Sequence, residues 1–115
     1  MKPTAKPLAA PKATLRTNRL GAHLAWSGEV TAVTRDEVWN RTTLLLDSRA
    51  QAGGEVAIDL GQVRFVDGAG LGLMVRVRRT AHHYGIPLRF LNAGDAVSRI
   101  VRLAKLENFL LGEAA

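Results

Sequence analysis

Residues 63–73, V-R-F-V-D-G-A-G-L-G-L, contain the change of pattern that decides the fold. Just before them, V-A-I-D-L (residues 56–60) alternates between large apolar and smaller or polar side chains, which is typical of a β-strand. Just after them, from about residue 69 to 84, apolar residues recur at helical spacing. The stretch therefore predicts a tight turn from a central strand into a helix, with Asp67 as the helix N-cap.

The rest of the chain extends this alternation in both directions. Residues 13–17 and 22–27, separated by turn signals at 19–21, indicate a β-hairpin, and residues 88–91 indicate a short strand. A helix is expected over residues 35–52, begun by a capping box between Thr34 and Glu37 and ended by Gly53 and Gly54, and a third helix over residues 97–104. The order β-β-α-β-α-β-α predicts an α/β domain with a mixed sheet of four to five strands and three or more helices.

Length and composition favour one small domain. The chain has 115 residues, of which 47% are hydrophobic and 23% charged, so neither a wholly disordered chain nor a membrane-spanning one is expected. Residues 1–12 form a Pro- and Lys-rich tail without the apolar core of a secretory signal, and residues 13–115 form the domain. We expect a cytoplasmic protein.

Catalytic and metal-binding chemistry finds little support. The absence of cysteine excludes disulfides and thiolate sites, and His82 and His83 diverge by about 100° on a helix, so no metal site is expected. No nucleophile elbow, phosphate-binding loop or zinc-protease motif occurs, and Asp67 reads as a helix cap rather than as the partner of Asp59 in a carboxylate pair. The sequence therefore predicts a protein that is not an enzyme and needs no cofactor.

The net charge of +6 is unevenly distributed. Three lysines in residues 1–12 contribute +3 without any acid among them, and the domain contributes the other +3. The tail is either a solvated terminus or an electrostatic tether to acidic lipid or nucleic acid. Nucleic-acid binding is the less favoured interpretation of the domain, because the domain lacks a recognised nucleic-acid-binding motif.

The turn at residues 67–71 and the helix after it offer two further features. Free amides and the helix dipole at a glycine-rich turn stabilise a phosphoryl group or an acidic side chain, although tight packing without a ligand explains the glycines equally well. The helix carries a basic flank that either docks an acidic partner or is a solvated face. The flank consists of Arg76, Arg78, Arg79, His82 and His83.

These residues together resemble a known family. The run at 63–73, the preceding V-A-I-D-L, the later G-I-P-L-R-F (85–90) and V-S-R-I-V-R-L (97–103), and W-S-G-E-V-T (26–31) are similar to STAS domains over roughly residues 13–111. STAS domains are best known as bacterial anti-sigma-factor antagonists. The resemblance implies a non-catalytic interaction module in signal transduction and transcription regulation, with an anti-sigma factor of the GHKL kinase type as partner.

The chain departs from the family at the regulatory position. The family turn typically reads D-S-S-G-L or D-T-S-G-L, and its second hydroxyl residue is phosphorylated by the partner kinase. Aligned on Asp67 and Gly70, that position is Ala69, and the preceding one is Gly68. Because alanine has no oxygen to phosphorylate, the resemblance implies a permanently neutral turn and an always-on binder.

A second branch of the same family is also compatible. Small STAS subunits of bacterial ABC phospholipid transporters bind the ATPase subunit through the same helix and turn, and L-A-K-L (103–106) is similar to their C-terminal stretch. They usually keep a threonine after the aspartate, which Gly68 does not match. In either branch, Gly72 permits close backbone approach or packs on the sheet. The expected partner-binding residues are Asp67, Gly68, Ala69, Gly70 and Leu71, with Arg76, Arg79 and His83 as flank contacts.

Overall fold

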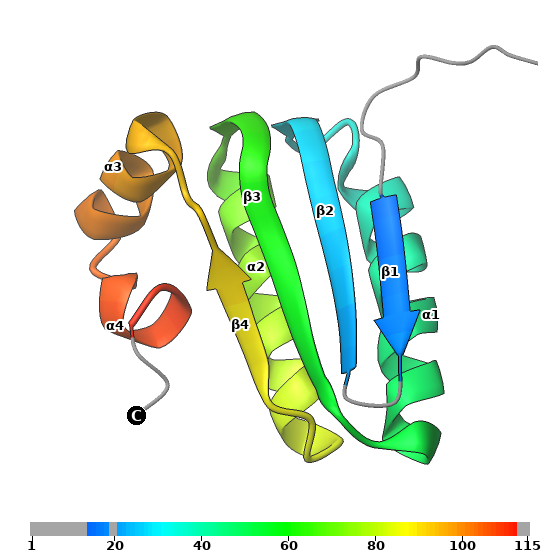
Figure 1. Cartoon of the computed structure of the whole chain (residues 1–115). Helices are drawn as coiled ribbons and strands as arrows, with labels where there is room; N and C mark the ends of the chain where they lie inside the picture. The colour runs from blue at the N-terminus through cyan, green and yellow to red at the C-terminus, as the bar shows by residue number, and fades with distance from the viewer. Residues whose placement is uncertain (1–13, 19–20, 113–115) are drawn as a thin grey trace, which may run out of the picture.

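The computed structural model describes residues 14–18 and 21–112, and for residues 14–18 it describes the backbone. The predicted tail at residues 1–12, and Arg19 and Leu20 of the predicted turn, lie outside the described residues. Figure 1 shows the elements in the order β-β-α-β-α-β-α-α, which confirms the predicted architecture and adds one short helix. They are β1 (Thr14–Asn18), β2 (Gly21–Val30), α1 (Arg35–Ala52), β3 (Glu55–Val66), α2 (Gly68–His83), β4 (Leu88–Leu91), α3 (Asp95–Leu103) and α4 (Glu107–Leu110).

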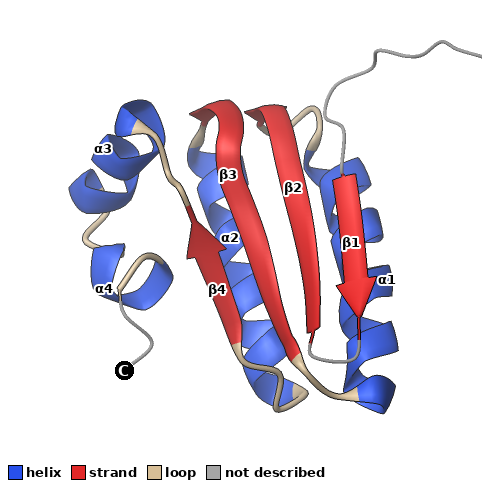
Figure 2. Cartoon of the chain, in the orientation of Figure 1, coloured by secondary structure: helices blue, strands red, loops and turns tan. Residues whose placement is uncertain are grey.

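The four described strands form one mixed sheet in the order β1-β2-β3-β4 (Figure 2). β1 is antiparallel to β2, whereas β2 with β3 and β3 with β4 are parallel. β3 extends beyond the predicted 56–60, because buried Val63 and Val66 continue its contribution to the core. Val30 and Val66 are paired at the ends of β2 and β3, so the turn into α2 lies beside the end of β2.

The core lies between the sheet and the two long helices, α1 and α2, which are behind the sheet in Figure 1. Ile58 and Leu60 of β3 and Met74 and Val77 of α2 are completely enclosed. Trp26 of β2 is also buried and satisfies its indole N–H by donating to the Thr42 hydroxyl of α1 at 3.1 Å, which is how this core accommodates two polar groups.

The start of α1 differs from the predicted capping box. The Thr34 hydroxyl donates to the Glu29 carbonyl at 2.7 Å and accepts from the Thr31 amide at 3.0 Å, so it closes the loop before the helix instead of capping it. The Glu37 carboxylate pairs with Arg41 one turn later, at 3.1 Å. The capping-box prediction was wrong because the Thr31 amide, and not the Glu37 amide, donates to the threonine hydroxyl, which in turn donates to the Glu29 carbonyl of β2.

The chain reversals at the other end of the helices follow the expected glycine chemistry. Gly53 and Gly54 have φ values of 80° and 91°, and Gly85 has a φ of 72° after α2. The Gly85 and Ile86 amides donate to the carbonyls of His82 and Ala81, the Schellman pattern that ends a helix. Lys105 adopts the same left-handed conformation after α3, with a φ of 61°, and the chain turns there into α4.

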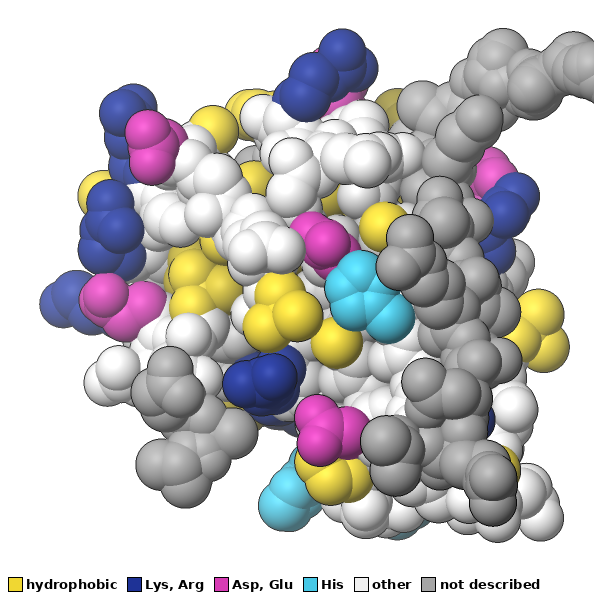
Figure 3. Space-filling view, viewed as in Figure 1, with side chains coloured by type: hydrophobic (Ala, Val, Ile, Leu, Met, Phe, Trp, Pro, Cys, Tyr) yellow, Lys and Arg dark blue, Asp and Glu magenta, His cyan; other side chains and the backbone are white. Residues whose placement is uncertain are grey.

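The sheet face away from α1 and α2 carries a small polar cluster. Figure 3 views this face, and a histidine lies there beside an acidic side chain. They are His23 and Asp59, whose Nε2 and Oδ2 atoms are 3.6 Å apart. Asp59 also accepts hydrogen bonds from the Gly61 amide at 2.8 Å and the Asn92 side chain at 3.3 Å. Asp59 is thus engaged with its sheet neighbours, as expected, and not with Asp67.

Candidate docking site

Asp67 fixes the turn between β3 and α2. Its Oδ1 accepts the Gly70 amide at 2.8 Å, which confirms the predicted N-cap, and its Oδ2 accepts the Ala32 amide at 3.2 Å. The Asp67 amide donates to the Val30 carbonyl at 3.3 Å. One side chain therefore ties the start of α2 to the loop at residues 31–34.

The same contacts decide the charge of the turn. The Gly70 amide has the largest effect and lowers the pKa of Asp67; burial, the second-largest effect, raises it, and the Ala32 and Ala69 amides lower it further. The carboxylate is therefore ionised at neutral pH and already accepts the Gly70 amide at the start of α2. That amide is not free to stabilise a phosphoryl group or a partner's acidic side chain, whereas the expectation for the rest of the turn stays a prediction.

The two glycines nearest the turn have opposite surroundings. Gly70 is buried, and a Cβ there would overlap the carbonyl oxygen of Val30. A Cβ at Gly68 would meet no atom within 4 Å. Gly70 therefore belongs to the packing between α2 and β2, whereas Gly68 leaves the surface open.

An exposed stripe runs along α2, and we call it the α2 face. Its members are spaced by three or four residues, so they share one side of the helix, and each is exposed. Small residues occupy its N-terminal part and cations its C-terminal part. The α2 face consists of Gly68, Gly72, Arg76, Arg79 and His83.

The remaining predicted contacts lie beside this face. Ala69 is half-buried at its edge, in the first turn of α2, and Leu71 is half-buried against the core. Among the eight predicted contact residues, Gly68, Arg76, Arg79 and His83 share the exposed stripe. Asp67 anchors its start, and Gly70 lies beneath it.

A hollow of about 450 Å³ opens between the N-terminal halves of α1 and α2. The guanidinium carbon of Arg76 lies 3.9 Å from the centre of the Trp39 ring, which places a cation over an aromatic face on its wall. The α1 side of this hollow, which includes Trp39, was not predicted from the sequence. The lining residues are Arg35, Asp36, Trp39, Gly68, Ala69, Gly72, Leu73 and Arg76.

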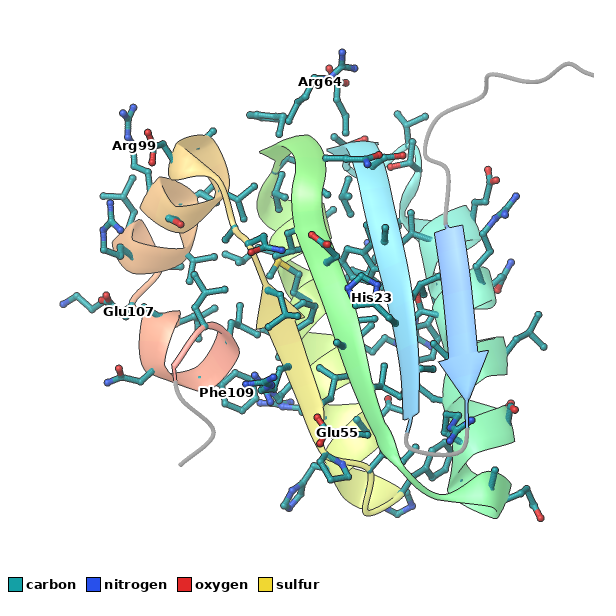
Figure 4. The ribbon with its side chains drawn as sticks, in the orientation of Figure 1. His23, Glu55, Arg64, Arg99, Glu107 and Phe109 are labelled. Atoms are coloured by element: carbon teal, nitrogen blue, oxygen red, sulfur yellow. The ribbon has the colours of Figure 1, made fainter. Side chains whose placement is uncertain are left out.

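Two exposed apolar side chains lie at the same end of the molecule and were also missed. Val33, in the loop that Asp67 holds, is 90% exposed, and Phe65 near the end of β3 is 47% exposed. Figure 4 shows Arg64 at this end of β3. Neither Val33 nor Phe65 lines the hollow.

Arg78 does not belong to the basic flank. Its guanidinium turns inward and donates to the carbonyls of Leu88 and Leu110, and it lies 5.7 Å from the centre of the Phe90 ring. Burial lowers the pKa of Arg78. It joins α2, β4 and α4, so its role is to hold the C-terminal helices on the sheet.

The family model described as "Mlab, STAS domain" matches residues 13–112. The chain belongs to the STAS domain family. A search of curated protein sequences found no match.

Solved structures agree with this assignment at the level of the fold. The unphosphorylated anti-sigma factor antagonist SpoIIAA matches with a TM-score of 0.69 at 15% identity, covering 87% of this chain and 86% of that one. SpoIIAA of Bacillus in its phosphorylated form matches with a TM-score of 0.64 at 14% identity, covering 87% and 89%. An anti-sigma factor antagonist from Mycobacterium paratuberculosis matches with a TM-score of 0.70 at 18% identity, covering 90% and 87%. This STAS domain therefore has the fold of anti-sigma-factor antagonists.

In the described ranges, 14–18 and 21–112, no helix has the length and apolar character that crossing a membrane requires. The same residues contain no group of three or more His, Asp or Glu side chains placed to hold a metal ion.

Proposed function

We propose that this STAS domain is a non-catalytic docking module that binds a protein partner through the α2 face and the hollow beside it. The observation that carries the proposal is the position of the hollow. It opens at Ala69, the residue that aligns with the family's phosphorylated position, and its wall holds the Trp39 and Arg76 pair.

The surface chemistry indicates what the partner presents. Gly68 and Gly72 let a partner's side chain or backbone approach α2 closely, and Val33 and Trp39 offer apolar contact. Arg76, Arg79 and His83 follow along the same helix face. The complementary surface therefore has an apolar centre with acidic residues on the side of the cations.

Docking of this kind resembles that of an anti-sigma-factor antagonist, for which the partner is an anti-sigma factor of the GHKL kinase type. Gly68 and Ala69 carry no hydroxyl group, so the partner cannot phosphorylate the turn at the family position. A phosphate would have added about 1.5 to 2 negative charges next to Asp67. Without that switch, binding depends on the abundance of the partners.

The lack of a hydroxyl residue at the family position also favours a second candidate, a STAS subunit of a bacterial ABC phospholipid transporter. A subunit that stays bound to its ATPase needs no phosphorylation switch, whereas an antagonist that must release its partner does. Both candidates use the same surface. They are distinguished by whether the bound partner is a kinase or a transporter ATPase.

The experiment compares Ala69→Glu with Ala96→Glu. Each alanine is the second residue of its helix, α2 or α3, so the two variants add the same charge at the same helix position, but Ala96 is exposed and does not line the hollow. We expect Ala69→Glu to weaken partner binding at least tenfold, because a carboxylate then fills the hollow beside ionised Asp67, while Ala96→Glu binds like the wild type.

The partner is captured from a lysate of the source organism, identified by mass spectrometry, purified, and titrated by calorimetry against all three proteins. Circular dichroism confirms that each variant is folded. Equal affinities for the two variants would show that the turn is scaffold and not interface.

A further inference from the structure

We call the hollow between the N-terminal halves of α1 and α2 the docking hollow. The opposite end of α1 contains a buried arginine without a described partner. Arg49 is 7% exposed, and its Nε and Nη2 atoms are enclosed without a hydrogen bond to any described residue. The ion pairs of the described residues do not include it. Buried polar groups in native proteins nearly always have a partner, and an unpaired buried charge is costly. Arg49 therefore points to a binding group that the isolated chain lacks.

Arg49 lies in the wall of a second hollow, of about 300 Å³. This hollow is enclosed by the end of α1, the start of β3 and the segment from α2 to β4, which Figure 1 shows at the other end of the helices from the 67–71 turn. It is therefore separate from the docking hollow. Beside Arg49 it is lined by Ala50, Gly53, Gly54, Glu55, Tyr84, Gly85, Ile86 and Pro87.

The polar groups of this hollow favour an anion over a cation. The Gly53 amide already has an acceptor, because it donates to the Arg49 carbonyl at 2.7 Å. The Gly54 amide makes no backbone hydrogen bond to a described residue. Arg49 and the Gly54 amide are both donors. Neither can hold a cation, and a neutral apolar ligand would leave the guanidinium unpaired.

Two acidic side chains lie near the hollow. Asp47 does not line it, and its carboxylate accepts a hydrogen bond at 2.9 Å from the hydroxyl of Tyr84, which lines the hollow. Glu55 is its one acidic lining residue, but Val56 faces the core, so the preceding side chain projects from the opposite face of the sheet. Figure 4 shows Glu55 on that side, near the start of β4. The carbonyl ends of α1 and α2 carry partial negative charge, which stabilises the Arg49 cation. The same partial charge weakens the affinity of the hollow for an anion.

We propose that this hollow binds the phosphate or carboxylate group of a small molecule, with Arg49 as the binding residue. A guanidinium presents its N–H groups as a planar fork that matches the oxygens of either group. The ligand supplies the hydrogen-bond acceptors that the described chain does not. The proposal is independent of the docking function, because it concerns the other end of the helix pair.

The test compares the wild type with Arg49→Met and with a matched control, Arg102→Met. Arg49 and Arg102 both occupy the last turn of a helix, but Arg102 is exposed at the end of α3, so the control removes the same charge from a different place. Melting temperatures are measured against inorganic phosphate, acetate and chloride at equal ionic strength. Phosphate stabilises proteins generally by exclusion from their surface, so the difference between variants is the quantity of interest.

At about ten times the dissociation constant, we expect the ligand to raise the melting temperature of the wild type and of Arg102→Met roughly 5 °C more than that of Arg49→Met. Without ligand, Arg49→Met should melt at or above the wild-type temperature, because it removes an unpaired buried charge. A larger effect of phosphate than of acetate assigns the site to phosphate compounds, and the reverse assigns it to carboxylates.

Nuclear magnetic resonance gives a second measurement that does not depend on stability. The amides of Gly53, Gly54 and Gly85 should shift saturably with the bound anion in the wild type. In Arg49→Lys, which keeps the charge but loses the fork, they should shift less at the same concentration. Identical titrations in the wild type and both Arg49 variants, or no saturable shift with either anion in the wild type, would overturn the proposal.

Discussion

Gly70 and Gly72 lie two residues apart in α2, and replacing each by alanine should change stability in opposite directions. Alanine in a helix is favoured over glycine by about 1 kcal/mol. A Cβ at Gly72 meets no atom within 4 Å, so Gly72→Ala should gain that amount. A Cβ at Gly70 would overlap the Val30 carbonyl and lie 3.0 Å from the Val66 side chain. In Gly70→Ala this overlap forces α2 away from the sheet, at a cost of up to ~3 kcal/mol. After the helix preference of alanine is subtracted, Gly70→Ala should lose about 2 kcal/mol in the free energy of unfolding.

The two variants should therefore differ by about 3 kcal/mol in the free energy of unfolding, or roughly 12 °C in melting temperature for a domain of this size. Thermal melts and urea titrations followed by circular dichroism measure both quantities. Shifts of the same sign, or a Gly70→Ala protein that melts within about a degree of the wild type, would refute this placement of α2. Gly72→Ala should also bind the partner more weakly despite its greater stability, because the added methyl group lies in the docking hollow.

Three other perturbations have defined outcomes. Val77→Asp should unfold the domain, because an unpaired charge at a position with 0% exposure costs at least ~4 kcal/mol, and an unchanged thermal melt would contradict this. Lys105→Gly should raise the melting temperature by about 4 °C, since Lys105 has a φ of 61° that glycine adopts with less strain. Because the pKa of Asp67 is lowered from 3.8, its stabilising effect is present above that value and lost as the pH falls below it. The stability difference between the wild type and Asp67→Asn should therefore shrink in acid, as melts from pH 7 to pH 2.5 would show.

The sequence predicted best those features that neighbouring residues determine. The bounds of α1 and β4 match the expected 35–52 and 88–91, because helical spacing, glycines and an alternating pattern specify them locally. Asp67 caps α2 because its partner, the Gly70 amide, is three residues away. The Thr34 capping box failed for the converse reason, since its hydroxyl reaches the Glu29 carbonyl of the preceding strand. The helix α4 was missed because four residues are too few to show a period.

The candidate site was harder to predict, because it depends on which side each helix turns toward the other. Trp39 is only partly buried and Arg76 lies over its ring, a contact between two helices that no local pattern specifies. Arg78 does have a local signal that the sequence analysis overlooked. It follows buried Met74 by four residues and precedes buried Ala81 by three, so it shares the inward side of α2. The burial of Arg49 shows likewise that a charge cannot be assigned to the surface from its residue type.

The aspartate and the hydroxyl residue of the family turn have separable roles, and this chain keeps one without the other. Both oxygens of Asp67 are used within the chain, one by the start of α2 and the other by the loop that presents Val33. The aspartate is therefore needed to shape the surface whether or not the turn is ever phosphorylated. Gly70 is fixed by its close approach to β2 in the same way. In this chain the aspartate and the glycine thus shape the turn, and the two residues between them, Gly68 and Ala69, determine that it cannot be phosphorylated at the family position.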